Sequence, residues 1–196
     1  MSVSEVATPF VLVSGSTVNA GWQQVADYVR PRQRAWAETN GVGFSWMTME
    51  SRNGRLPHWD KIMLLRQAFI LNTTLFWLDG DCIPTQSLTL SHLVPESNKV
   101  RCLTDTNAEW CTGGMLFPGE SWVLDMLRYW YDMATAKDLS HPWQDQYTFH
   151  RLLRKTRKFL HRGGSSISRE LVCHPCGIGT KYEFLKEREA SFFPPQ

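Results

Sequence analysis

The chain lacks a long apolar run. Its first residues, MSVSEVATPFVLVSGST, contain no basic segment, and FVLV is too short for the apolar part of a signal peptide or an anchor. No segment approaches the roughly 20 apolar residues that a membrane-spanning helix needs. We therefore expect no membrane span and a cytoplasmic location.

An excess of charge of one sign is also missing. The 21 Lys and Arg residues nearly balance the 19 Asp and Glu residues, which leaves a formal net charge of +2. Balanced charge gives no support for a nucleic-acid or membrane-surface footprint over the whole molecule, so we expect no nucleic-acid partner. With 42% hydrophobic residues, the composition is that of a folded globular protein rather than a disordered one.

A cysteine pattern typical of a disulfide framework is missing as well. The five cysteines are an odd number spread along the chain, a pattern that does not suggest a disulfide-stapled secreted fold but still allows one bridge. A reducing compartment is the simpler interpretation. There is no internal repeat, low-complexity stretch or linker, and 196 residues are a usual length for one domain. We expect a single domain over residues 1–196.

Aromatic side chains, by contrast, are abundant. Nine tryptophans and ten phenylalanines exceed what a core of this size requires. Large aromatic side chains are mostly buried, so most of these are expected to pack internally. We expect some of the others to line a groove.

The order of apolar patterns predicts an α/β fold. Strands are expected at PFVLVSGS, VGFSWMTME and TLFWLDGD, where apolar runs meet turn residues. Helices are expected between them, at residues 20–41, with a kink or break at Pro31, and at residues 59–71, with Ile62, Leu65, Phe69 and Ile70 on one stripe. This alternation predicts a central, mostly parallel sheet flanked by helices.

The second half of the chain continues the alternation less regularly. We expect a short helix or turn at 87–94, strands at 100–105 and from the glycines of 111–119, helices at 120–134 and 142–156, and a last strand at 167–175. The helix at 120–134 is expected to place Trp122, Met126, Tyr129, Trp130 and Met133 on one side. The end of the chain is expected to be loosely ordered.

Asp79 and Asp81 follow the apolar run LFWL at the carboxyl end of a predicted strand, where open α/β sheets place ligand crevices. Residues i and i+2 of a strand share a face, so both carboxylates converge if the extended geometry persists through Gly80. Mg²⁺ or Mn²⁺ is the natural partner for two adjacent carboxylates. The alternative is a solvated Asp-Gly-Asp turn.

His174, in CHPCG, ends a distant predicted strand, and its imidazole suits a third ligand position beside two carboxylates. A zinc site on Cys173, His174 and Cys176 is the alternative, although it lacks a second C-x-x-C pair. Lys181 follows a Gly-rich loop and could meet a phosphate, or it could simply be solvated.

Asp145 and Gln146 begin a predicted helix. There they could cap the helix and complement its dipole, or they could project into the crevice and orient a polyhydroxylated substrate. Gly113 and Gly114 would then allow close approach of the backbone to that substrate.

Taken together, these segments resemble the GT-A glycosyltransferases of the galactosyl- and mannosyltransferase type. The similarity lies in P-x-W-x-K before an apolar strand and Asp-x-Asp, in TGGMLF, in the Asp-Gln pair and in a late His-x-x-Gly, and it covers roughly residues 10–181, leaving 182–196 as a tail. The glycogenin-like and xylosyltransferase-like retaining branch is the most similar. The resemblance implies a metal-dependent transfer of a hexose or pentose from a UDP- or GDP-sugar to a glycan acceptor.

The resemblance also implies roles for particular residues. Asp81 and His174 would bind Mn²⁺ or Mg²⁺, with Asp79 on the metal or the ribose. Asp145 and Gln146 would face the transferred sugar in the catalytic step. The donor would lie against Ser14, Gly15, Ser16, Lys61, Gly113, Gly114, Gly177 and Lys181.

The chain departs from the family in three respects. It is short, Thr112 stands where related sequences often carry asparagine, and the spacing from His174 to Lys181 is longer by one residue than in the glycogenin-like pattern. Two other hypotheses stay open: another metal-dependent phosphoester enzyme such as a nucleotidyltransferase, and a carbohydrate- or nucleotide-binding module without turnover.

Overall fold

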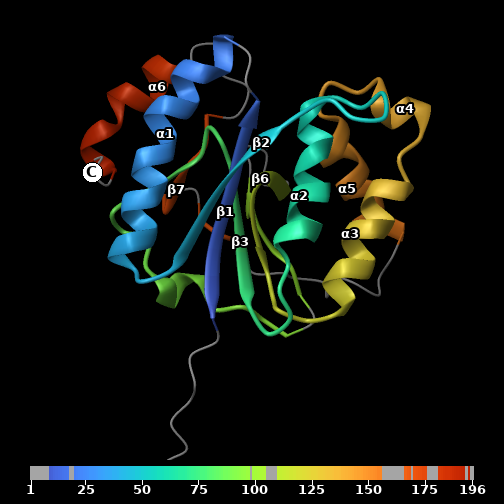
Figure 1. Cartoon of the computed structure of the whole chain (residues 1–196), viewed down its shortest axis with the longest axis horizontal. Helices are drawn as coiled ribbons and strands as arrows, with labels where there is room; N and C mark the ends of the chain where they lie inside the picture. Colours follow the sequence, from blue (N-terminus) through green and yellow to red (C-terminus); the bar gives the residue numbers. More distant parts are fainter. Residues whose placement is uncertain are drawn as a thin grey trace, which may run out of the picture.

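A five-stranded sheet with the order β2-β1-β3-β6-β5 runs through the centre of the molecule (Figure 1). The computed structural model describes residues 9–17, 20–97, 99–104, 110–155, 166–168, 170–175, 181–192 and 194. The strands of the sheet are β1 (Phe10–Thr17), β2 (Gly43–Met49), β3 (Thr74–Asp79), β5 (Arg101–Thr104) and β6 (Trp110–Phe117).

Strand β1 pairs in parallel with β2 and β3, whereas β6 is antiparallel to both of its neighbours, β3 and β5. Within this sheet β6 alone is therefore reversed. The predicted α/β fold with a mostly parallel sheet is confirmed.

Helices cover both faces of the sheet (Figure 1). Helices α1 (Ala20–Thr39) and α6 (Lys181–Glu187) lie on one side, and α2 (Asp60–Ala68), α3 (Trp122–Asp132), α4 (Ala136–Leu139) and α5 (Gln144–Lys155) lie on the other. Among the described residues, no helix combines the length and the apolar character that crossing a bilayer requires.

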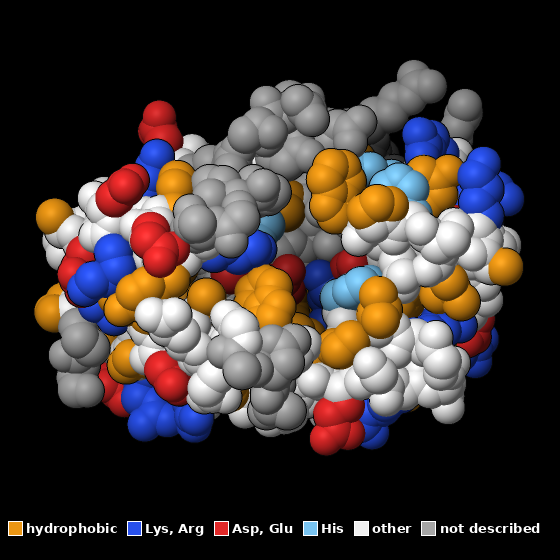
Figure 2. Space-filling view, turned by 90° about the horizontal axis from the view of Figure 1, so that it is seen from above, with side chains coloured by type: hydrophobic (Ala, Val, Ile, Leu, Met, Phe, Trp, Pro, Cys, Tyr) orange, Lys and Arg blue, Asp and Glu red, His pale blue; other side chains and the backbone are white. Residues whose placement is uncertain are grey.

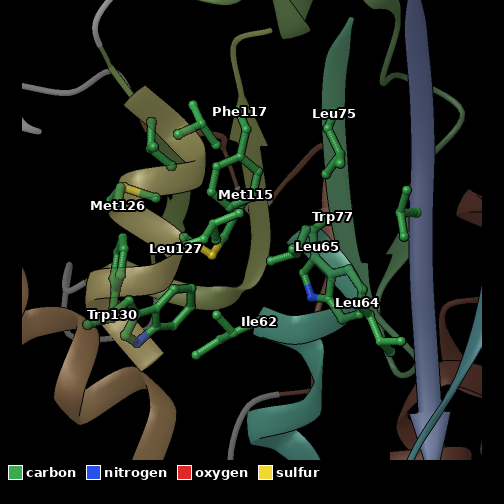
Figure 3. Packing of buried hydrophobic residues seen from close by; sticks show 14 of the residues in the cluster. Ile62, Leu64, Leu65, Leu75, Trp77, Met115, Phe117, Met126, Leu127 and Trp130 are labelled. Atoms are coloured by element: carbon green, nitrogen blue, oxygen red, sulfur yellow. The ribbon is translucent and has the colours of Figure 1, made fainter. Parts of the chain in front are cut away.

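Strand β3 is buried on both faces, which explains its continuous apolar sequence. Leu75 and Trp77 point into the cluster formed with α2 and α3 (Figure 3), whereas Phe76 and Leu78 belong to the cluster on the side of α1. All four residues are at most 1% exposed. Because successive side chains of a strand alternate between faces, one short strand supports both halves of the core.

Short elements connect segments that are far apart in the sequence. The 3₁₀ helices are η1 (Pro57–Trp59), η2 (Leu90–Leu93) and η3 (Glu189–Ser191), and β4 (Ile83–Pro84) pairs antiparallel with β7 (Val172–Cys173). Ile83 lies opposite Cys173 in that pair. The chain that follows Asp81 is thereby placed beside the chain that precedes His174.

Several expected boundaries are wrong. There is no break at Pro31: helix α1 continues through it as one element, with Val29 and Trp36, both fully buried, on either side. Strand β6 begins at Trp110, before the glycines. Among the described residues, the expected strand at 167–175 is reduced to β7 and a single bridge at Ile167, since its pairing partner β4 is itself only two residues long.

Two predicted apolar helix faces and the predicted loosely ordered chain end also differ from the structure. Ile70 lies beyond the end of α2 and is 62% exposed, and Tyr129 of α3 is 43% exposed, because each residue falls outside the face that meets the sheet. The end of the chain is ordered through residue 192: Leu185 and Phe192 are 0% and 2% exposed against α1.

Candidate active site

A cavity of about 490 Å³ opens where β1, β2 and β3 end, the edge at which open α/β sheets bind ligands. Figure 2 looks onto this edge: the surface is hollowed near its centre, charged side chains lie at the floor, and hydrophobic and histidine side chains lie around the rim. The cavity brings together ten of the residues singled out in the sequence: Gly15, Ser16, Lys61, Asp79, Asp81, Gly113, Asp145, Gln146, His174 and Lys181.

The two aspartates do not share one strand face. Strand β3 ends at Asp79, and Gly80 and Asp81 form a turn in which the Cys82 amide donates to the Asp79 carbonyl oxygen at 2.9 Å. A Cβ at Gly80 would lie 2.7 Å from the Gly15 carbonyl oxygen, so only glycine fits this crossing. The expectation that extended geometry persists through Gly80 is wrong, because the close approach to β1 bends the chain there.

Asp81 lies among cationic and potentially cationic groups. Its side chain is 4% exposed, is ion-paired with Lys181, and has Oδ1 3.5 Å from His174 Nε2. Burial opposes the charge on Asp81, but His174 and Lys181 hold the pKa of its carboxyl well below its usual range. Burial likewise opposes a charged imidazole, yet Cys82 and Asp81 raise the pKa of His174 well above its usual value.

Asp79 belongs to a different network, centred on Lys61. The Lys61 ammonium group lies 2.8 Å from Asp145 Oδ2 and 3.2 Å from Asp79 Oδ1, and its side chain is 2% exposed. Trp77 Nε1 donates to Asp79 Oδ1 at 2.7 Å, and Thr112 Oγ1 donates to Asp145 Oδ2 at 3.0 Å. One buried ammonium group therefore lies between two carboxylates.

Within this network, Lys61 and Asp145 are both held in their charged forms. Burial disfavours the charge on Lys61, but Asp145 and Asp79 raise its pKa above the usual value. Burial also opposes the charge on Asp145, but Lys61 is the main group that lowers its pKa. The site thus keeps a fixed carboxylate at Asp145 at neutral pH.

Asp81 and His174 are the residues that best fit a divalent cation. In the described part of the chain, the group with donor atoms within 4.8 Å of one another is Asp81, Cys82 and His174. Burial raises the pKa of the Cys82 thiol to about 12, and a protonated thiol is a poor ligand. A carboxylate oxygen beside an imidazole nitrogen can hold Mn²⁺, whereas Mg²⁺ favours oxygen alone.

Comparison with known proteins bears on the fold. No family model matches the chain, and no curated protein sequence matches it. The structure aligns with a glycosyltransferase involved in the glycosylation of the major capsid of PBCV-1, with a TM-score of 0.67 and 13% identity over 93% of this chain and 99% of that one.

Two further glycosyltransferase structures align with this chain. GlyE of Streptococcus pneumoniae TIGR4 gives a TM-score of 0.57 and 12% identity, over 93% of this chain and 50% of that one. The galactosyltransferase LgtC gives 0.51 and 11%, over 95% and 98%. The chain has the GT-A fold.

Two of the predicted donor residues, Ser14 and Gly114, do not reach the cavity of this GT-A fold. Ser14 is fully buried within β1, and a Cβ at Gly114 would lie 2.3 Å from Leu103 Cδ1, inside the core. Gly113 lines the cavity, whereas the next residue, Gly114, packs against Leu103. Gly177 lies outside the described residues, as does Cys176 of the alternative zinc site.

The GT-A cavity also contains Gly80 and Thr112, which the sequence analysis discussed, and residues that it missed: Thr17, Trp22, Met49, Leu56, Pro57, His58, Cys111, Pro142 and Trp143. Trp22 lies by Lys181, whose Nζ is 4.7 Å from the indole ring centre. Two features of the sequence could have identified cavity residues. His58 lies inside the P-x-W-x-K segment, and Trp143 directly precedes Gln144, Asp145 and Gln146. The excess of aromatic residues indicated a groove without saying which residues line it.

His58, one of the residues that line the cavity, has an unusual environment. Its Nε2 atom is buried and has no hydrogen-bond partner in the described part of the chain. Burial lowers the pKa of His58, so its imidazole is neutral at neutral pH.

Proposed function

We propose that this chain is a glycosyltransferase that moves a hexose or pentose from a nucleotide-diphosphate sugar to a hydroxyl group of a glycan or another acceptor, with Mn²⁺ or Mg²⁺ and with retention of anomeric configuration. One observation carries the proposal: on a GT-A fold, Asp81, His174 and Lys181 meet the Lys61–Asp79–Asp145 network around one cavity. A structure of LgtC, which has the same fold, contains donor and acceptor sugar analogs.

The leaving-group end of the reaction is assigned to Asp81, His174 and Lys181. Asp81 and His174 would hold the metal, and Asp79 would contact the ribose or the metal. When bound, such a cation supplies Lewis-acid stabilisation of a diphosphate as negative charge develops on it. Lys181, raised in pKa and therefore charged, pairs with Asp81 and is the group that would also reach the diphosphate.

The sugar end is assigned to Asp145 and Gln146. Asp145 is fixed by Lys61 and Thr112 and stays ionised, which suits it to stabilise positive charge at the anomeric carbon. Gln146 Oε1 accepts a hydrogen bond from the Thr112 amide at 3.2 Å, which orients its side chain at the same wall. No strong nucleophile is required if the acceptor hydroxyl attacks from the face that the diphosphate leaves.

Thermal unfolding with ligands tests the proposal. UDP, GDP and their sugar conjugates should raise the melting temperature in the presence of Mn²⁺ and lose that effect with EDTA. A ligand at about 100 times its Kd adds about 2.7 kcal/mol to the free energy of unfolding. A chain that no nucleoside diphosphate stabilises, with or without metal, would contradict the proposal. For an active chain, NMR of the product reports its anomeric configuration.

A further inference from the structure

The rim of the cavity carries apolar side chains that the proposed donor contacts do not use. Trp143 is 60% exposed and Leu56 is 50% exposed, although both line the cavity. Figure 2 shows hydrophobic and histidine side chains next to one another along this rim. Exposed large apolar side chains gathered at a cavity mouth are typical of a binding surface.

Contacts with neighbouring residues hold Trp143 in place. Its backbone amide donates to His141 Nδ1 at 3.1 Å, and the His141 ring stacks on Tyr147 of α5 with ring centres 4.3 Å apart. The His141 and Trp143 ring centres lie 6.1 Å apart. The indole is therefore presented on a supported turn, and a pre-positioned aromatic ring loses little freedom when a ligand covers it.

Leu56 and His58 approach from a second element that is tied to the same helix. Trp59 Nε1 donates to Gln144 Oε1 at 2.9 Å, which joins η1 to the first residue of α5. Both His58 and Trp143 line the cavity, and His58 also interacts electrostatically with Asp145. An exposed indole and an imidazole ring are thus brought to one wall of the cavity, next to the proposed sugar end.

We infer that Leu56, His58 and Trp143 form the acceptor subsite, in which Trp143 packs on the apolar face of a sugar ring and Leu56 and His58 border that ring. A pyranose ring presents C–H groups on one face, which an exposed indole can cover. The inference rests on the proposed function and names a carbohydrate as the acceptor class.

Binding to an array of neutral glycans tests the subsite against many candidate acceptors at once. The full-length chain is labelled and applied with Mn²⁺ and UDP or GDP, as wild type and as Trp143→Ala, Trp143→Phe, His58→Phe and Tyr129→Ala. Tyr129 is an exposed aromatic residue on α3 outside the cavity and serves as the matched control. Trp143→Ala should weaken binding on the order of tenfold, and Trp143→Phe should retain most of it.

His58→Phe keeps a ring at the edge of the subsite, so it should weaken glycan binding less than Trp143→Ala does. With the best-bound glycan as acceptor, Trp143→Ala should raise the KM for acceptor and leave the KM for donor unchanged. The melting-temperature shift caused by the nucleotide with Mn²⁺ should be the same in every variant, which separates this inference from the proposed function.

The inference is overturned if the wild type binds no glycan on the array, if Trp143→Ala binds as well as the wild type, or if Tyr129→Ala loses binding to the same extent. Loss of the nucleotide shift in the wild type would instead contradict the proposed function, and the glycan data would then decide the subsite independently.

Discussion

Lys61 balances the charge of the site. It lies in the first turn of α2, is almost fully buried, and faces two carboxylates from different elements, Asp79 of β3 and Asp145 of α5. A buried charge is tolerated when opposite charges and hydrogen bonds surround it, and removal of one partner leaves the others uncompensated. Lys61 therefore stabilises the folded state and, with Thr112, orients Asp145.

Lys61→Met should lower the free energy of unfolding by roughly 3–5 kcal/mol, because Asp79 and Asp145 lose their shared cation in a buried setting. Urea denaturation measures the change. The exposed Lys137→Met should stay within about 0.5 kcal/mol of wild type. Asp145→Asn added to Lys61→Met should recover part of the loss. A Lys61→Met chain as stable as wild type would mean that the two carboxylates need no cation.

Asp81→Asn tests the proposed metal site. The amide loses the charge that the carboxylate offers a cation, so the affinity for Mn²⁺, measured by electron paramagnetic resonance of the free ion, should fall by at least about tenfold. Transfer activity should be lost with it. Asp132→Asn, at an exposed position of α3, is the matched control and should bind Mn²⁺ as wild type does. Unchanged affinity in Asp81→Asn would exclude Asp81 as a ligand.

At the scale of elements, the reversed strand β6 shapes the cavity wall. It runs beside β3 so that Gly114 lies opposite Leu78, and the preceding glycine meets the ring of His174. The site therefore depends on a contact between β6 and the segment after β7, far apart in the sequence. Gly113 is needed because its neighbour is a histidine ring at van der Waals distance.

Gly113→Ala should displace His174 with little cost in stability. The added Cβ would lie 2.7 Å from His174 Cε1 and 2.9 Å from Nε2, closer than these atoms can approach, and the side chain is easier to move than the strand. We expect Mn²⁺ affinity to fall about tenfold or more. Gly43→Ala is the control, since its Cβ would meet Val11 at an ordinary 3.4 Å. Equal Mn²⁺ affinity in both variants would show that His174 is not displaced.

The contact between α1 and α6 predicts a dependence of stability on alkaline pH. Tyr28 is 8% exposed, and its ring centre lies 5.4 Å from that of Tyr182. Burial raises the pKa of Tyr28 from 10.0 to about 12, despite the opposing effect of Arg32. Its contribution is present below pH 10, where the phenol is neutral in both states, and is lost as the pH rises toward 12, because the unfolded chain ionises first.

Tyr28→Phe removes the ionisable group, so its free energy of unfolding should fall less than that of wild type between about pH 10 and 12, by about 2–3 kcal/mol over the range. Chemical denaturation at each pH measures both chains. Since other groups titrate in the same range, only the difference between the two profiles is informative. Parallel profiles would contradict the raised pKa.

At the scale of the whole molecule, the central sheet divides two apolar layers, one under α2 and α3 and the other under α1. Strand β3 contributes to both, whereas α6 contacts the remainder of the fold through Leu185, its aromatic neighbours and the ion pair of Lys181 with Asp81. The burial of an element sets the free energy needed to open it locally. The molecule should therefore open at its C-terminal helix long before its central strand.

Native-state hydrogen exchange should show this order. Amides of β3 should exchange only through global unfolding, and those of α6 should exchange orders of magnitude faster through local opening. A low concentration of denaturant should accelerate exchange of the β3 amides as steeply as it promotes global unfolding. Exchange of the α6 amides should depend only weakly on denaturant. Equal protection of the β3 and α6 amides would mean that the strand and the helix open together.

The prediction of the fold succeeded where local pattern is strong. TLFWLDGD gave a buried strand, and the alternation with amphipathic helices gave the α/β class, because buried surface forces a periodic sequence. It failed at Pro31, at the length of the strand around Cys173 and at the C-terminal helix. There the outcome depends on packing against residues far away in the chain, which no local pattern records.

The site divides in the same way. The amino-acid sequence by itself determined which groups are available, including Asp79, Asp81, Asp145 and His174, and the end of a strand at which a ligand crevice forms. Only the tertiary structure decided their pairing: Asp79 with Lys61, Asp81 with His174 and Lys181. It also decided that Trp143 stays exposed at the rim. Chemical type is a property of each residue, whereas partnership and exposure depend on distances that arise only when the chain folds.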